Sequence, residues 1–185
     1  MSISFIAKLS SIVSVMLVLG GSAYAAPSEE IQAQLSSSTQ SKATGTVDFM
    51  PLKGNKIEIV GDITGLTPGE HGMHVHAVGD CSDVSGGFKK SGGHFNPDST
   101  NHGALQSGHA GDLGNIVADA KGEARFKIET NKFNLIENDK HSILGRALVV
   151  HAGQDDEKTN PAGNSGERIL CGVIKNKITS TSLLK

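Results

Sequence analysis

The sequence predicts an all-β domain, built either as a sandwich or as a barrel. Three observations support this: short runs in which apolar and polar residues alternate, turn signals between those runs, and 23 glycines without a sustained 3.6-residue apolar period. Alternation places one face of each run in a core. Evenly spaced turns between short strands are typical of sandwiches and barrels. Internal repeats and coiled-coil heptads are absent from the sequence.

The first 25 residues have the three parts of a secretory signal. Lys8 precedes an apolar run over 12–19, and a small-residue cleavage site ends at Ala25. The run is too short to span a bilayer as a stable helix. We therefore divide the chain into a signal peptide, 1–25, and one mature domain, 26–185, which is long enough to form a core. No membrane contact is expected after cleavage.

The charge balance argues against nucleic acid as a partner. Without Lys8 the chain carries 16 basic and 19 acidic side chains, a formal charge of about −3. Binding to nucleic acid or to an anionic membrane surface normally requires an excess of positive charge.

Three segments along the chain are expected as half-buried strands separated by turns at 53–55, 67–69 and 121–122. Their inward-facing residues are Ile31, Ala33 and Leu35; Ile57, Ile59 and Ile63; and Ala124, Phe126 and Ile128. Two long polar, glycine-rich stretches, 79–111 and 152–168, separate later segments. Loops longer than about 15 residues in a compact domain are usually functional.

His74 and His76 lie on a strand that leads into the first long loop. An extended chain puts residues i and i+2 on one face, so both imidazoles project together while Met73, Val75 and Ala77 can face the core. Imidazole is the commonest ligand for copper and zinc in proteins. Taken alone, however, a pair of this kind is more often two solvated strand histidines.

A second group of residues falls inside the first loop. Within nineteen residues the chain places His94, His102, His109 and Asp112. Three histidines and a carboxylate are a complete tetrahedral zinc set, and a closed four-ligand site of this kind is structural rather than catalytic.

His151 ends the apolar run 147–150, where a strand leaves the core. It can complete a copper site with the earlier pair, or it can face solvent at the strand end. Asp155 is a candidate acceptor for the second ring N–H of a ligating histidine, although spacing alone does not separate it from Asp156. His71 and His141 fit no ligand set, and we interpret them as ordinary polar residues.

Cys81 and Cys171 are the only two cysteines of the chain. An even number of cysteines in an exported chain predicts a disulfide. The alternative is a pair of buried free thiols.

The ordered motifs of the chain resemble those of the copper/zinc superoxide dismutases. The motifs are Gly72-Met73-His74-Val75-His76, Gly92-Gly93-His94-Phe95-Asn96-Pro97, His109-Ala110-Gly111-Asp112-Leu113-Gly114-Asn115, Val149-Val150-His151 and Gly166-Glu167-Arg168-Ile169-Leu170-Cys171-Gly172-Val173-Ile174. The signal segment and the insertion at 86–90 are most similar to the exported bacterial branch, which implies a periplasmic location.

The resemblance implies an eight-stranded Greek-key β-barrel, related to the immunoglobulin-like sandwich, with two long functional loops. It also implies one copper ion and one zinc ion per subunit. The implied copper ligands are His74, His76, His94 and His151, and the implied zinc ligands are His94, His102, His109 and Asp112. The remaining implied roles are the supporting aspartate at Asp155, the active-site arginine at Arg168 and the disulfide between Cys81 and Cys171.

The implied activity is dismutation of superoxide to dioxygen and hydrogen peroxide, in antioxidant defence. Copper cycles between two redox states, His94 bridges it to the structural zinc and transfers a proton, and Arg168 docks the superoxide anion. Lys89 and Lys90 are weaker candidates for steering that anion. A homodimer is one expectation, and the sequence leaves the oligomeric state open.

A second class of function is a periplasmic protein that binds copper or zinc without turnover. Dismutase-like domains that have lost catalysis normally lack a ligand or the arginine. In this sequence every one of these positions is present.

Overall fold

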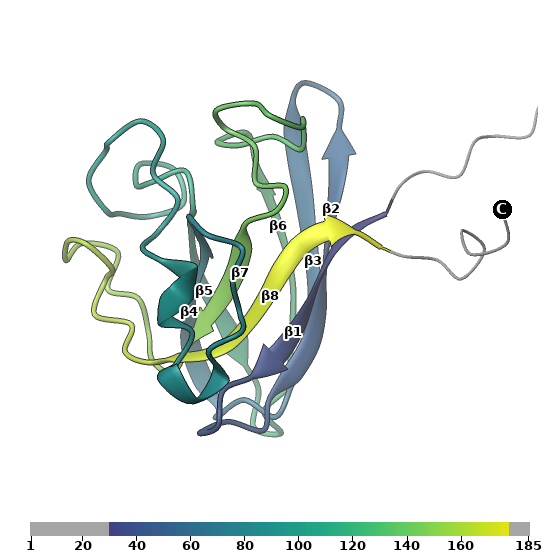
Figure 1. Ribbon diagram of the computed structural model, residues 1–185. Helices are drawn as coiled ribbons and strands as arrows, with labels where there is room; N and C mark the ends of the chain where they lie inside the picture. Colours follow the sequence, from purple (N-terminus) through teal and green to yellow (C-terminus); the bar gives the residue numbers. More distant parts are fainter. Residues whose placement is uncertain (1–29, 178–185) are drawn as a thin grey trace, which may run out of the picture.

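The computed structural model describes residues 30–177, so the predicted signal peptide 1–25 lies outside the described residues. The described part contains eight strands and two short 3₁₀ helices (Figure 1). The strands are β1 (Ile31–Ser37), β2 (Thr44–Leu52), β3 (Lys56–Thr64), β4 (Gly69–His76), β5 (Asp112–Ala118), β6 (Ala124–Thr130), β7 (Ala147–His151) and β8 (Arg168–Asn176). Among residues 30–177 no helix is long and apolar enough to cross a membrane.

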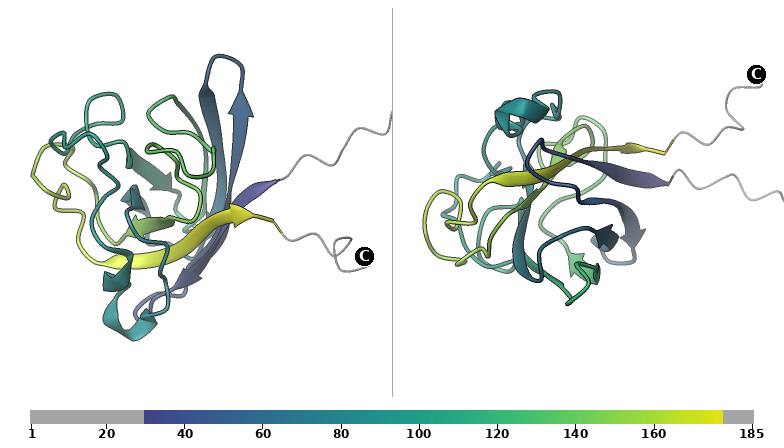
Figure 2. Two further views of the ribbon diagram at one scale, coloured as in Figure 1. Left: turned by 45° about the horizontal axis from the view of Figure 1, so that its top comes forward. Right: turned by 90° about the horizontal axis from the view of Figure 1, so that it is seen from below.

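The eight strands form one antiparallel sheet in the order β5-β4-β7-β8-β1-β2-β3-β6. The first and last strands of this order, β5 and β6, contact each other, so the sheet curls into a nearly closed barrel (Figure 2). The connections from β3 to β4 and from β6 to β7 join strands that are not paired neighbours, which is Greek-key connectivity. The predicted all-β, eight-stranded barrel is confirmed.

The alternating patterns place the expected residues in the core. Ile57, Ile59 and Ile63 of β3 are buried, as are Ala33 and Leu35 of β1. Of the three residues expected on β6 only Ala124 is fully buried, while Phe126 and Ile128, like Ile31 of β1, pack against the core from its margin. The Phe126 ring lies over Gly61 of β3, where an added Cβ would be 2.1 Å from the ring. A glycine on β3 therefore makes room for an aromatic ring on the neighbouring strand.

Two long loops lie on the same side of the barrel (Figures 1 and 2). One joins β4 to β5 over 77–111 and contains the 3₁₀ helices Val84–Gly86 and Lys89–Ser91; the other joins β7 to β8 over 152–167. A disulfide between Cys81 and Cys171 ties the first loop to β8, as predicted. Phe88 of the same loop is fully buried beside Cys171. The first loop is therefore anchored to the barrel both covalently and by packing.

Candidate metal centre

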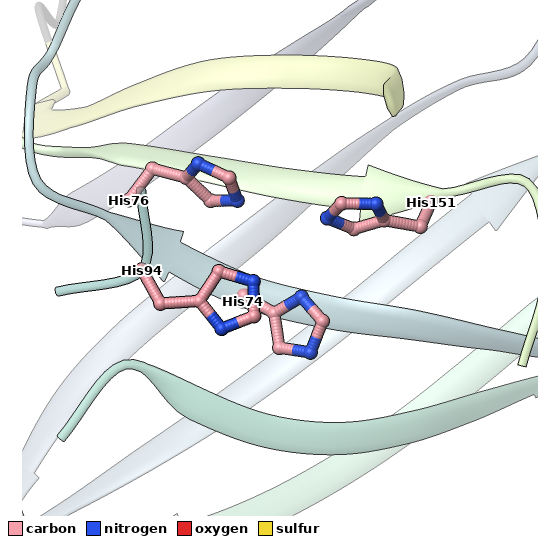
Figure 3. A group of neighbouring side chains, drawn as sticks. All are labelled: His74, His76, His94 and His151. Atoms are coloured by element: carbon pink, nitrogen blue, oxygen red, sulfur yellow. The ribbon is translucent and has the colours of Figure 1, made fainter. Parts of the chain in front are cut away.

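Four histidines that are far apart in the sequence meet beside β4 and β7. His74, His76, His94 and His151 each place a ring nitrogen within 4.8 Å of the others'. Figure 3 shows the four rings facing one another. The structure thus brings the predicted copper ligands together. His74, His76 and His151 are buried, so none of the three is a solvated histidine on a strand.

Strand geometry explains this convergence. Met73 and Val75 of β4 point into the core, so the alternate residues His74 and His76 share the other face, as predicted. Ala77, which was expected to face the core as well, is exposed because β4 ends at His76. His151 lies at the end of β7, which pairs with β4.

His94 reaches the cluster from the first long loop. It forms an isolated antiparallel bridge with His76, the last residue of β4. The chain on either side is held by hydrogen bonds between the backbones of Phe95 and Val75 and of Ala77 and Gly93. The loop therefore enters the site almost as an additional strand.

The donor atoms of the cluster fit a metal ion. Within residues 30–177, seven buried side-chain nitrogen or oxygen atoms lack a hydrogen-bond partner, and five of the seven are imidazole nitrogens of these sites. The five are His74 Nδ1, His76 Nε2, His94 Nε2, His102 Nδ1 and His151 Nε2. Buried unpaired polar atoms are costly, and native folds keep few of them. A copper ion bound by the unpaired nitrogens of His74, His76, His94 and His151 would satisfy four of these five atoms at once.

The opposite nitrogen of each copper-set ring is held by the protein. His76 Nδ1 lies 2.9 Å from the Gly92 carbonyl oxygen, and His151 Nδ1 lies 3.0 Å from the Gly166 carbonyl oxygen. Because a carbonyl only accepts, each of these nitrogens carries the proton and leaves Nε2 as a lone pair. His74 has the reverse arrangement, with Nε2 2.7 Å from Asp155 Oδ2.

The second predicted group also assembles, around Asp112. His94 Nδ1, His102 Nδ1 and His109 Nδ1 lie 2.8, 3.0 and 3.2 Å from the Asp112 carboxylate oxygens. Asp112 is fully buried, and its Oδ2 accepts hydrogen bonds from the backbone N–H groups of Gly103 and His109. Three nitrogens and one carboxylate oxygen that crowd together in this way are the donor set of a closed zinc site.

Asp155 connects the two groups. Its Oδ2 lies 2.7 Å from His74 Nε2 and its Oδ1 lies 2.9 Å from His102 Nε2. The Asn115 side-chain amide holds the Asp155 backbone: it donates to the Asp155 carbonyl and accepts from the Asp155 N–H. Asp156, which spacing alone did not separate from Asp155, is exposed and accepts hydrogen bonds from Thr159 and Asn164 instead.

Burial keeps three of the copper-set imidazoles neutral. Desolvation lowers the pKa of His74 to about 4, of His76 to about 2 and of His151 to about 3. At neutral pH these rings are in the form that ligates metal. Burial alone would raise the pKa of Asp112, but the hydrogen bond from His94 and the charges of the neighbouring histidines lower it below its usual range. Asp112 is therefore an anionic ligand.

Arg168 begins β8 next to the copper set. Its Nη1 donates to the Phe88 carbonyl at 2.8 Å and to Ser91 Oγ at 3.0 Å. Arg168 and Lys89 line one surface pocket of about 380 Å³. Lys90, the other candidate for steering, donates to Ser82 Oγ at 3.2 Å.

Sequence reasoning missed two supporting residues. His71, interpreted as an ordinary polar residue, is buried, with Nδ1 2.8 Å from the His151 carbonyl oxygen and Nε2 2.8 Å from the Thr67 carbonyl oxygen. Asn115 lies within a recognised motif, but its contact with Asp155 spans 40 residues and leaves no local signal. His141 contacts Asp98 and belongs to neither cluster.

The comparisons with known proteins agree with this geometry. Residues 43–174 match the copper/zinc superoxide dismutase family. The chain is 44% identical to superoxide dismutase [Cu-Zn] 2 of Mesembryanthemum crystallinum, over 70% of this chain and 85% of that protein. It also resembles the crystal structure of the clock protein EA4, with a TM-score of 0.71 and 38% identity over 80% of this chain and 95% of that one. With the family matched over most of its length, the chain belongs to the copper/zinc superoxide dismutases, enzymes that bind copper and zinc and act on superoxide.

Proposed function

We propose that this enzyme dismutates superoxide at a copper ion that His94 bridges to a structural zinc ion. One observation carries the proposal: His94 belongs to both donor groups, with Nε2 unpaired among the copper set and Nδ1 2.8 Å from Asp112. The copper ligands would be His74, His76, His94 and His151. The zinc ligands would be His94, His102, His109 and Asp112.

Bound copper supplies one-electron chemistry, which turns one superoxide into dioxygen and a second, with two protons, into hydrogen peroxide. The residues around the site prepare for this in three ways. Carbonyl oxygens fix the tautomers of His76 and His151, and Asp155 fixes those of His74 and His102. His94, with a ring nitrogen on each side, is the residue that we assign to proton transfer.

Arg168 is assigned to docking the substrate. A guanidinium is always charged and presents several N–H donors in a fixed fork, which suits a small anion. Its Nη1 is anchored by two neutral acceptors, so the positive charge stays available to attract superoxide. Lys89 and Lys90 lie in the same loop and are the two candidate lysines that could add to this field.

We further propose that the enzyme is exported to the periplasm as the mature domain 26–185 and protects against superoxide there. The signal-like segment 1–25 supports export. The Cys81–Cys171 disulfide supports it too, because disulfides form and persist in oxidising compartments such as the periplasm. A homodimer is one candidate for its assembly.

The bridge can be tested by substituting cobalt(II) for zinc in the copper-loaded protein. Two paramagnetic ions that share one imidazole couple magnetically, so the copper EPR signal should be strongly reduced with cobalt and intact with zinc. A full copper signal in protein that holds stoichiometric cobalt would show that His94 does not bridge. A metal-loaded protein that consumes no superoxide would favour the non-catalytic metal carrier.

A further inference from the structure

Ser91 is a buried serine that touches both halves of the proposed active site. It ends the 3₁₀ helix Lys89–Ser91, three residues before His94, and is fully buried. Its Oγ lies 2.7 Å from the Phe88 carbonyl oxygen, 3.0 Å from Arg168 Nη1 and 3.4 Å from His76 Nδ1. One hydroxyl therefore contacts the arginine assigned to docking and a ring of the copper set.

Proton accounting fixes the direction of these bonds. A hydroxyl has one hydrogen and two lone pairs, and the Phe88 carbonyl can only accept, so the Ser91 hydrogen points to Phe88. The lone pairs then face Arg168 Nη1, which can only donate, and the N–H of His76, whose main acceptor is the Gly92 carbonyl. The three contacts together use the one hydrogen and both lone pairs of the hydroxyl.

The anchor behind this serine is rigid. Phe88 is fully buried in a cluster with Ala147, Val149 and the disulfide cysteine Cys171. Its carbonyl accepts from Arg168 Nη1, from the Ser91 hydroxyl and from the Ser91 backbone N–H. Arg168 Nη1 is thus held by two acceptors that are themselves held by the core.

Both acceptors are neutral, and this matters for an anionic substrate. A carboxylate at the place of Ser91 Oγ would hold the guanidinium just as firmly but would cancel its charge at the mouth of the site. A hydroxyl positions the arginine without adding a second negative charge to that of Asp83, which already acts on the guanidinium.

We propose that Ser91 is a positioning residue for anion capture, which holds Arg168 in register with the copper set through its hydroxyl. The proposal rests on the docking role assigned to Arg168. Ser91 itself does not touch the substrate; it acts through the guanidinium.

The test is the affinity of the copper- and zinc-loaded protein for azide, a small monoanion whose binding is followed by the copper absorption spectrum. Ser91→Ala should weaken azide binding by about threefold, which is less than the roughly tenfold cost of losing a hydrogen bond to a charged group outright, because the Phe88 carbonyl still holds Arg168 Nη1. Ser91→Cys has a side chain of similar size that is a poor acceptor, so its azide affinity should lie between those of the unaltered protein and Ser91→Ala. This variant serves as the test if the alanine variant folds badly. Copper content and melting temperature are measured alongside.

A double-mutant cycle separates positioning from general loosening. In an Arg168→Ile background, Ser91→Ala should have no further effect on azide affinity, because the residue through which it acts is gone. The matched control is Ser165→Ala: Ser165 is also buried and donates to a carbonyl, that of Ala162 at 2.8 Å, but in the other long loop. It should leave azide affinity unchanged.

Three results would overturn the proposal: unchanged azide affinity in both Ser91 variants, an equal loss in the Arg168→Ile background, or an equal loss in Ser165→Ala. The azide titration needs no turnover. If the azide titration contradicts the role of Ser91, the proposal that the enzyme dismutates superoxide still stands. If the loaded protein consumes no superoxide, the proposed function is wrong, but the azide titration still tests the role of Ser91.

Discussion

At the scale of single residues, the site depends on which nitrogen of each imidazole is occupied. His76 and His151 give Nδ1 to backbone carbonyls, and His74 gives Nε2 to Asp155, so each ring has one nitrogen left for metal. The group around Asp112 could be predicted from residue types and spacing, whereas His94 as a member of the first group could be predicted only from the family motifs. The tautomers could not, because the carbonyls and Asp155 that fix them are distant in the chain.

Asp112→Ala should empty the zinc site and leave copper bound. Asp112 is the only anionic residue among the four proposed zinc ligands, and loss of one ligand from a closed tetrahedral site lowers affinity heavily. Elemental analysis should give about one copper and far less than one zinc per chain. Asp156→Ala, which removes an exposed carboxylate from the neighbouring loop, is the control and should keep both metals. Tight stoichiometric zinc in Asp112→Ala would refute the assignment.

The metal-free protein should lose stability as the pH falls below about 6.5. The folded-state pKa values of His74, His76 and His151, about 4, about 2 and about 3, lie below the ordinary value of 6.5. The unfolded chain therefore binds these protons first, and the free energy of unfolding decreases by at most roughly 1.4 kcal/mol per pH unit for each histidine. This stability is fully present above pH 6.5 and falls until about pH 4 for His74, about pH 3 for His151 and about pH 2 for His76.

Melting temperatures of the metal-free protein at pH 7.5 and pH 5 measure this effect. His151→Gln should make the dependence shallower, because it removes one of the three buried rings whose pKa is lowered. A melting temperature that does not change between the two pH values would contradict the neutral, buried state of these rings.

At the scale of elements, two loops on a rigid barrel hold most of the chemistry. The disulfide and Phe88 fix the first loop, and Asp155 ties the second loop to a ligand from each metal set. Three of the strands, β1, β3 and β6, could be predicted from alternation, and the extent of both loops from glycine content. The choice of Asp155 over Asp156 could not, because adjacent residues on a turning chain point in directions that spacing does not reveal.

Gly163→Ala should disrupt the link between the two metal sets. Gly163 has φ +63°, and a Cβ there would lie 1.8 Å from Asp155 Oδ1 and 2.6 Å from His102 Nε2. The collision should displace Asp155, weaken both sites and lower the melting temperature of the metal-loaded protein by several degrees. Gly145→Ala is the matched control, since Gly145 has φ +75° but open space around its would-be Cβ. Equal effects of the two variants on metal affinity would show that backbone strain, and not the collision, is responsible.

At the scale of the whole molecule, strands of the barrel themselves carry most of the metal centre. β4 and β7 pair side by side and deliver three of the four copper-set histidines, while β8 brings Arg168 and the disulfide to the same end. The family motifs predicted this assembly. Composition and spacing alone reached only an all-β sandwich or barrel, because strand order depends on pairings between segments far apart in the chain.

Export and disulfide formation should occur together. The segment 1–25 has the pattern of a secretory signal, and the disulfide joins residues 90 positions apart. Intact mass spectrometry of protein from the periplasm should give a chain that starts at Ala26 and is lighter by two hydrogens than the reduced form. An uncut chain, or two free thiols in the exported protein, would count against periplasmic maturation.

The most direct measurement is the rate of superoxide decay, followed by pulse radiolysis, in the copper- and zinc-loaded mature protein and in Arg168→Ile. We predict catalytic decay that slows with rising salt in the unaltered protein. In Arg168→Ile we predict a rate lower by about tenfold with a weaker salt dependence, because screening acts on the field that the arginine supplied. Copper content and melting temperature should barely change. Decay no faster with the fully loaded protein than with its metal-free form would contradict dismutation at this site, and an unchanged rate and salt dependence in Arg168→Ile would contradict the docking role of the arginine.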